Sequence, residues 1–274
     1  MAACLLALAA CQRPETTHSE SLAEGELMRL PFPGWQADGK AHVQEVDLSA
    51  LAGNKGKASN SKIRAAVTPI QVEKLDDTHA VLLTETQPGD EDALTCHACK
   101  ATLGAYFFQH DEAGWRLTSR QDAVAEGGAY GQLGGVSITK LGNSHDAATV
   151  QWESCWQGYC GSWLALVGLQ PDHATRLAKG IPLSVDSDGA HASCRALDDP
   201  KNADAEAKSN ECLDIRSSWQ FQGNRLIVAF EGRLSEFDSA GKLQPARKIA
   251  QQAVYEVKQD ELTLVMGDNP VPGF

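Results

Sequence analysis

The alternation of apolar and polar residues along the chain predicts antiparallel β-structure from about residue 63 onward. Short runs rich in valine, leucine, threonine and aromatic residues are separated by glycine, asparagine and aspartate, a composition typical of strands and turns. Three pairs of runs are joined by short turn sequences, which predicts hairpins. These hairpins span 105–110 with 115–119, 218–221 with 225–230, and 254–257 with 262–265.

Further apolar runs predict strands at 80–85, 148–153 and 163–169, and a short strand at 43–46 inside the otherwise loop-like stretch 38–60. A helix is expected only within 246–254. We therefore expect a mainly β fold of antiparallel sheets, arranged as a β-sandwich or as an incomplete, propeller-like structure and stapled by disulfides.

The first ten residues carry no charge, and a strongly polar stretch follows them, which is the pattern of an export signal. The segment Leu8-Ala9-Ala10-Cys11 resembles the lipobox of bacterial lipoproteins. This resemblance implies a signal peptide over 1–10 and a lipid on Cys11 that anchors the chain to a membrane. Residues 11–30 are then expected to form a flexible tether. Residues 31–274 are expected to form a β-rich extracytoplasmic body, with a candidate division into two subdomains near 190–215.

The charge of the chain narrows its expected partners. A net charge of −12 repels phosphate backbones and anionic headgroups, so nucleic acid is not expected as a partner and the lipid must attach the chain to the membrane. By analogy with enterobacterial lipoproteins, Gln12 in place of aspartate favours the outer membrane, with the body facing the periplasm. An envelope protein or a glycan is the expected partner.

The cysteines fit an oxidising compartment. Removing Cys4 with the signal and committing Cys11 to lipid leaves an even number, which predicts three disulfides. The sequence does not decide among the 15 connectivities of six cysteines. Pairing each cysteine with its nearest neighbour gives Cys96 with Cys99, Cys155 with Cys160, and Cys194 with Cys212.

The stretch Cys96-His97-Ala98-Cys99 resembles the active sites of thiol-disulfide oxidoreductases, in which a helix N-terminus activates the attacking thiol. Here an aromatic strand follows the motif instead of a helix, which favours a structural turn disulfide. A redox-active pair and a metal site remain as alternatives. We expect no metal and no cofactor, because a second C-x-x-C and a pair of closely spaced histidines are both missing.

Motifs for other chemistry are weak. The sequence contains no G-x-S-x-G, H-E-x-x-H or phosphate-binding loop. The stretch 186–189 begins like a calcium loop, but it lacks the third oxygen ligand and the distal glutamate, which favours an ordinary acidic turn.

Four aromatic residues surround the Cys155/Cys160 loop. Trp152 and Trp163 lie in predicted strands and are expected in the core, whereas Trp156 and Tyr159 are expected to be exposed and to offer a stacking platform for glycans. The predicted function is non-enzymatic binding or assembly support in the cell envelope. The alternative is a periplasmic thiol-disulfide oxidoreductase that uses the pair in the C-x-x-C stretch.

Overall fold

The computed structural model confirms the expected mainly β, antiparallel fold. It describes residues 17–36, 42–51, 62–88, 96–142, 145–190, 212–235, 238–240, 244 and 246–272. Within these ranges the chain forms thirteen strands in two antiparallel sheets, a short α-helix, α1 (Glu24–Met28), and one 3-10 helix, η1 (Ser49–Leu51). Cys11 and Cys194 lie outside the described residues.

The first sheet has five strands, and their spatial order follows the chain from β1 to β5. Each strand pairs antiparallel with the next strand of the chain, so all strand pairings in this sheet are between sequence neighbours. Its strands are β1 (His42–Asp47), β2 (Lys62–Lys74), β3 (His79–Pro88), β4 (Ala101–Asp111) and β5 (Gly114–Gly127).

The second sheet has eight strands, again in chain order from β6 to β13. Strands β9 and β10 pair only at Asp214 with Asp186 and at Ile215 with Val185, so the sheet opens there and folds over on itself. The strands are β6 (Gly135–Leu141), β7 (His145–Trp156), β8 (Tyr159–Leu169), β9 (Ala174–Asp186), β10 (Leu213–Gln222), β11 (Arg225–Leu234), β12 (Arg247–Lys258) and β13 (Glu261–Gly267).

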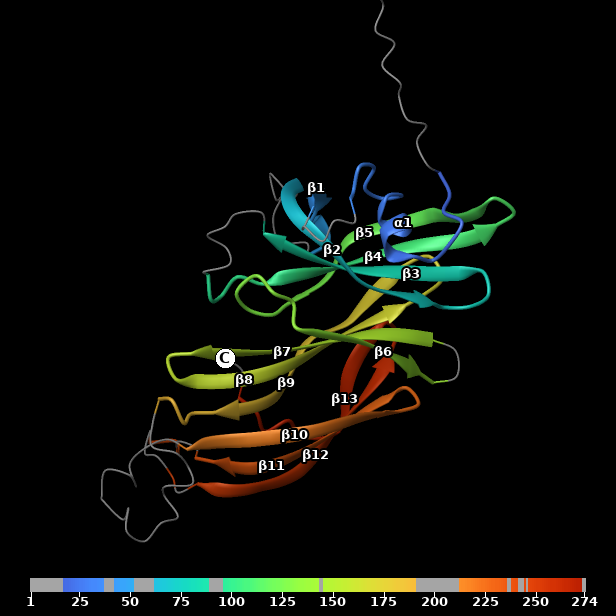
Figure 1. Ribbon diagram of the computed structural model, residues 1–274. Helices are drawn as coiled ribbons and strands as arrows, with labels where there is room; N and C mark the ends of the chain where they lie inside the picture. The colour runs from blue at the N-terminus through green and yellow to red at the C-terminus, as the bar shows by residue number, and fades with distance from the viewer. Residues whose placement is uncertain are drawn as a thin grey trace, which may run out of the picture.

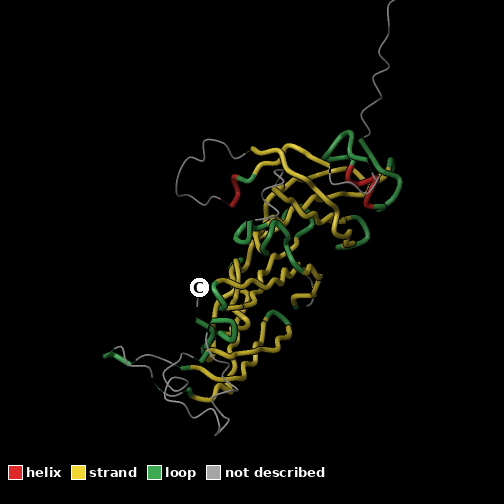
Figure 2. Tube along the Cα trace, turned by 60° about the vertical axis from the view of Figure 1, so that its left-hand side comes forward, coloured by secondary structure: helices red, strands yellow, loops and turns green. Residues whose placement is uncertain are grey.

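The result is a stack of three β-layers, formed by β1–β5, β6–β9 and β10–β13 (Figure 1). The turned view in Figure 2 shows the same stacking, with strands making up most of the described trace. Of the two expected arrangements, this one corresponds to the β-sandwich, with a third layer of strands added. The candidate division near 190–215 falls where the second sheet folds over, but β8 and β9 share a core with β10–β12 across that fold.

The middle layer is buried on both faces, which explains the uninterrupted apolar run of β8. Ala165, Val167 and Leu169 pack against β3, β4 and β5 in one core. Leu164 faces the opposite way, into the core shared with β10–β12. Because successive side chains of a strand point to opposite faces, only a strand covered on both sides needs apolar residues at every position.

The N-terminal segment belongs to the folded body, so the expected boundary at residue 31 is wrong. Ser19 forms an isolated β-bridge with Trp115, and both of its backbone hydrogen bonds to that residue measure 2.8 Å. Leu27 and Met28 of α1 are fully buried against the outer face of the first sheet, beside Tyr106. Residues 19–30 therefore cover a core instead of forming part of a tether.

The helix expected within 246–254 is also wrong, because this stretch belongs to β12. Alanine, lysine and glutamine favour helix, but here every residue from Arg247 to Glu256 pairs with β11. Ile249, Ala253 and Tyr255 alternate toward the core. Pairing and burial override the weak local preference for helix.

None of the helices among the described residues has the length and apolar character that a membrane span requires.

Candidate functional site

The candidate site lies where β7 and β8 extend beyond the core that they share with the first sheet. One face of β7 carries Ala148 and Val150 inside this core, followed by Trp152 at its margin and Trp156 in solvent. The hairpin of β7 and β8 reaches the left-hand edge of the molecule, below the first sheet (Figure 1). Because alternate residues of a strand share a face, these side chains form one row that runs from the interior to the exposed end of the hairpin.

Trp152 and Trp163 form the floor of the site. They are direct cross-strand partners, and their rings stack with centroids 6.1 Å apart and an interplanar angle of 19°. Glycines stand on both sides of the Trp152 ring. A Cβ on Gly127 would lie 2.9 Å from Trp152 Cε3, and one on Gly180 would lie 3.1 Å from Cη2. A side chain at Gly127 would force the indole to shift, and one at Gly180 would crowd it.

The C-x-x-C turn approaches the floor from the side of the first sheet. Cys96 and Cys99 are disulfide-bonded, and the Cys99 backbone N–H donates to the Cys96 carbonyl at 3.1 Å. Gly131 donates its backbone N–H to the Cys99 carbonyl at 2.8 Å, which ties the glycine-rich loop to this turn. The His97 ring lies edge-on to Tyr130, with centroids 4.7 Å apart.

The two disulfide loops meet through His97, whose ring centroid lies 5.9 Å from that of Trp156. The Trp156 side is held by the Cys155–Cys160 disulfide and by a turn in which Gln157 and Gly158 both have positive φ, 51° and 88°. Positive φ at both central residues defines the type I′ hairpin turn, which fits the twist of the strands.

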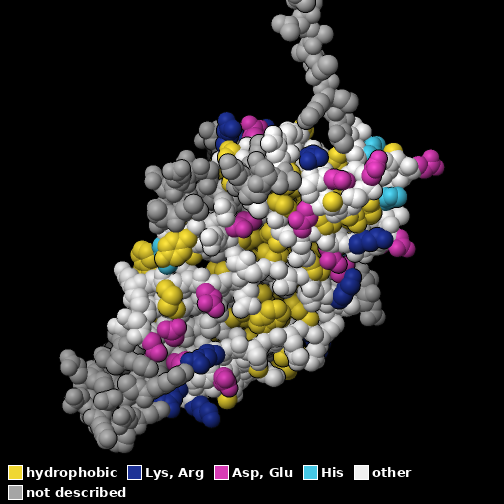
Figure 3. Space-filling view, in the orientation of Figure 1, with side chains coloured by type: hydrophobic (Ala, Val, Ile, Leu, Met, Phe, Trp, Pro, Cys, Tyr) yellow, Lys and Arg dark blue, Asp and Glu magenta, His cyan; other side chains and the backbone are white. Residues whose placement is uncertain are grey.

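Tyr130 and Trp156 are strongly exposed, at 48% and 63% of their surface. Tyr130 also has a φ of 53°, which a bulky residue rarely adopts and which the surrounding structure must enforce. Figure 3 shows hydrophobic side chains gathered around a histidine at the left-hand edge of the molecule. Large exposed aromatic side chains held in a rigid setting are typical of a recognition surface.

The space between these elements is a cleft with two lobes, which share His97, Gly128, Trp152, Ser154 and Cys155. We call the lobe of about 560 Å³ the aromatic lobe; its other lining residues are Ala98, Lys100, Trp156, Tyr159, Gly161, Trp163, Lys179 and Gly180. We call the lobe of about 650 Å³ the polar lobe; its other lining residues are Ala129, Tyr130, Gln132, Gly134, Gly135, Ser137, Thr149, Gln151, Glu153 and Trp219.

The cleft brings together most of the residues that the sequence singled out. Trp156 is exposed and Tyr159 half-buried, and both line the aromatic lobe. Trp152 and Trp163 were expected in the core, but each is only partly buried and also faces the cleft. Sequence reasoning gave His97 no part in a binding surface, because its ring partners, Tyr130 in the loop between β5 and β6 and Trp156 of β7, are distant in the chain.

The predicted disulfides 96–99 and 155–160 are confirmed. Cys212 is fully buried and disulfide-bonded. The Cys96–Cys99 pair lies in a turn that precedes β4, and the one α-helix of the described residues, α1, is elsewhere, against the first sheet. The helix N-terminus that activates the thiol of known exchange enzymes therefore has no counterpart here within the described chain.

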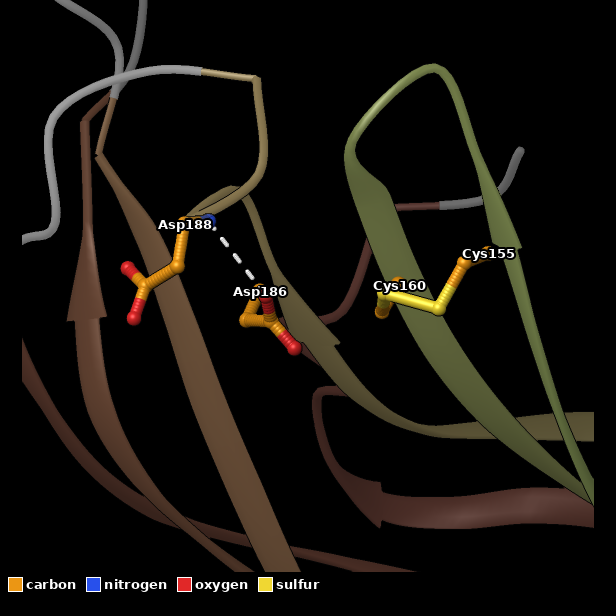
Figure 4. Close-up of a disulfide and its surroundings, with 4 residues drawn as sticks. All are labelled: Cys155, Cys160, Asp186 and Asp188. Atoms are coloured by element: carbon orange, nitrogen blue, oxygen red, sulfur yellow. Dashed lines mark hydrogen bonds between the residues drawn. A yellow bond between two sulfur atoms is a disulfide. The ribbon is translucent and has the colours of Figure 1, made fainter.

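The acidic stretch after β9 has the geometry of a turn. The Asp188 backbone N–H donates to Asp186 Oδ1 at 3.3 Å, and Figure 4 shows the two carboxylates pointing in different directions near the Cys155–Cys160 disulfide. The described residues contain no group of three histidine, cysteine, aspartate or glutamate side chains placed to hold a metal ion.

A second cavity, of about 590 Å³, lies on the first sheet and is lined by Phe32, Asp47, Arg120 and Asp122 among others. Its charged groups bond to one another: Arg120 Nε donates to Asp122 Oδ1 at 2.7 Å. This cavity is therefore the weaker candidate for a ligand site.

No family model, curated protein or solved structure matches the chain.

Proposed function

We propose that this chain is a cell-envelope lipoprotein that binds glycans in the cleft without transforming them. In this proposal the lipid on Cys11 holds the protein at the outer membrane, facing the periplasm. The binding role is supported mainly by one observation. The aromatic rings of His97, Trp152 and Trp156, which come from the C-x-x-C turn and from β7, line one cleft, and Trp156 is strongly exposed there.

Glycan chemistry suits this surface. The faces of a pyranose ring present C–H groups that pack on indole and phenol rings, while the hydroxyl groups at the ring edge bond to amides and hydroxyls. The polar lobe provides such partners at Gln132, Gln151 and Thr149, next to the stacked tryptophans. Each lobe also has the volume of a small-molecule site, roughly 300–1,000 Å³.

Binding is favoured over thiol-disulfide exchange by the setting of the C-x-x-C pair. Backbone hydrogen bonds hold its turn against the glycine-rich loop, which suits a rigid wall of a binding site. A working exchange enzyme needs a positive environment that stabilises the attacking thiolate, and a helix N-terminus commonly provides it.

Titration of the protein with N-acetylchitotetraose, followed by tryptophan fluorescence, tests the binding role. Wild-type protein should bind, and Trp156→Ala should lower the affinity about tenfold or more, because a central aromatic anchor of an interface commonly carries that much. Met266→Ala is the matched control, since Met266 is also strongly exposed, at 61%, but lies on β13 outside the cleft. No binding, or equal losses in the two variants, would contradict the proposal.

The anchoring part has its own test. The full-length chain, expressed in a Gram-negative host, should incorporate labelled fatty acid, and Cys11→Ser should abolish the labelling while leaving the six body cysteines intact. Labelling that persists in this variant would refute lipid attachment at Cys11.

A further inference from the structure

The aromatic lobe is locally basic in an acidic protein. The chain has a net charge of −12, yet the lining of this lobe contains two lysines, Lys100 and Lys179, and no aspartate or glutamate. A surface with excess negative charge repels anions in general, so an anionic ligand needs a place where the local charge is reversed.

The two lysines differ in their partners. Lys100 Nζ lies 3.2 Å from Glu126 Oε1, so its charge is largely compensated. Lys179 lies on β9, is exposed, and forms no ion pair with any carboxylate of the described residues. It directly precedes Gly180, which packs against the Trp152 ring. A lysine without a carboxylate partner among the described residues therefore lines the same lobe as the stacked aromatic floor.

The polar lobe has the opposite character. Its charged lining residue is Glu153, and its other polar groups are neutral amides and hydroxyls, Gln132, Ser137, Thr149 and Gln151. Such groups suit hydroxyl and acetamido substituents, and Glu153 disfavours a carboxylate there. The charge along the cleft thus changes from positive in one lobe to negative in the other, which sets a direction for an asymmetric ligand.

We infer that the ligand is a glycan with a carboxylate-bearing sugar, which occupies the aromatic lobe with its carboxylate on Lys179 while a neutral sugar occupies the polar lobe. This inference rests on the proposed glycan-binding function and adds the chemical class of the ligand. Hydrogen bonds between an ammonium and a carboxylate are about twice as strong as neutral ones, so this contact discriminates acidic from neutral sugars.

Three disaccharides test the inference in calorimetric titrations at low salt. N,N′-diacetylchitobiose is neutral, the N-acetylglucosamine–N-acetylmuramic acid disaccharide adds a lactyl carboxylate, and the N-acetylglucosamine–glucuronic acid disaccharide has its carboxylate on the ring. Wild-type protein should bind at least one acidic disaccharide about tenfold more tightly than the neutral one, the factor expected for one charge-assisted hydrogen bond. The acidic disaccharide that binds more tightly identifies the position of the carboxylate.

Lys179→Met should abolish the preference, by lowering the affinity for the acidic disaccharide about tenfold, to that for diacetylchitobiose. Lys248→Met is the matched control, because Lys248 is an exposed lysine of β12 outside the cleft, and its loss changes the net charge equally. This variant should keep the full preference.

Three results would overturn the inference. Equal affinities of the wild type for neutral and acidic disaccharides would refute the carboxylate contact but leave glycan binding intact. Equal losses in Lys179→Met and Lys248→Met would trace the preference to net charge instead of the cleft. Binding of none of the three disaccharides would refute the proposed function as well.

Discussion

The cavity on the first sheet and the aromatic lobe have nearly the same volume, about 590 Å³ and about 560 Å³, but their polar groups are used differently. In the first-sheet cavity, the charged side chains form hydrogen bonds or ion pairs with other groups of the protein. In the aromatic lobe, Lys179 is unpaired among the described residues and Trp156 is 63% exposed.

The first-sheet cavity is organised by Asp122, which is only 8% exposed. Its carboxylate accepts hydrogen bonds from Arg120 Nε at 2.7 Å, from Tyr106 Oη at 2.9 Å and from the Asp47 backbone N–H at 2.8 Å. Arg120 also donates to the Pro31 carbonyl at 3.0 Å and so ties down the N-terminal segment. Burial, aided by the Asp122 charge, raises the pKa of Tyr106, so its hydroxyl stays a donor.

Charged residues around a cavity therefore do not by themselves indicate a ligand site. A carboxylate that already accepts hydrogen bonds from three residues of the protein has few lone pairs left for a ligand, whereas a lysine without an ion-pair partner can donate all its hydrogen bonds to one. Substitutions in the two cavities should therefore affect different properties, stability on the first sheet and saccharide binding in the cleft.

The largest effect is expected for Asp122→Ala. The substitution leaves the guanidinium of Arg120 and the hydroxyl of Tyr106 without their acceptor and should lower the free energy of unfolding by about 3 kcal/mol, as when one partner of a buried pair is removed. Urea denaturation measures this change. Asp77→Ala, at a fully exposed carboxylate, is the control and should stay within about 0.5 kcal/mol. Saccharide affinity that falls with Asp122→Ala under folding conditions would contradict the separation.

The second prediction concerns the Cys155–Cys160 disulfide, which closes the turn that presents Trp156. Replacing both cysteines with serine should lower stability by about 2 kcal/mol in the chain-entropy model for so short a loop. It should also weaken saccharide binding, because Trp156 is then held less rigidly. Denaturation and fluorescence titration of the same preparation measure both. A stability loss with unchanged affinity would show that the turn need not be rigid for binding.

A third prediction uses the packing of Trp152. Gly127→Ala should cost about 1–2 kcal/mol through overpacking and should displace the indole, which lowers saccharide affinity. Gly168→Ala is the control, since its Cβ would lie 3.3 Å from Leu177 and outside the cleft. The control should affect stability alone. Equal affinities of the two variants would argue against Trp152 as the floor of the site.

The smallest effect on stability is expected at Asp76, which lies in the turn between β2 and β3 and lines neither cavity. A hydrogen bond from the Thr78 backbone N–H is the main cause that lowers its pKa to about 2, helped by bonds from His79. Because the unfolded pKa is about 3.9, the carboxylate stabilises the fold above about pH 4, and this contribution is lost as the pH falls toward 2.

Comparison with Asp76→Asn by urea denaturation at several pH values tests this prediction. The stability advantage of the wild type should be small, because the carboxylate is about half exposed, and it should decline between about pH 4 and pH 2. An advantage that does not change over this range would contradict the assigned cause.

Local sequence information predicted part of this molecule. The apolar runs at 80–85 and 163–169 identified strands because burial on both faces of a layer demands them. Strand β9 escaped prediction, since it contains Gly180 and Pro182 next to register shifts in its pairing with β8. In the site, Trp156 and Tyr159 were found from their place in a short disulfide loop. His97 and Lys179 were not, because only the stacking of the layers brings them to the same cleft.

The most direct test of the central claim uses the six tryptophans of the chain. Four of them line the cleft, Trp152, Trp156, Trp163 and Trp219, and the other two, Trp35 and Trp115, lie in the core under the N-terminal segment. In a two-dimensional ¹⁵N–¹H NMR titration with the preferred disaccharide, the indole N–H signals of the cleft tryptophans should shift together and saturate, while those of Trp35 and Trp115 stay in place. Shifts at Trp35 or Trp115 with unmoved cleft signals would contradict the account.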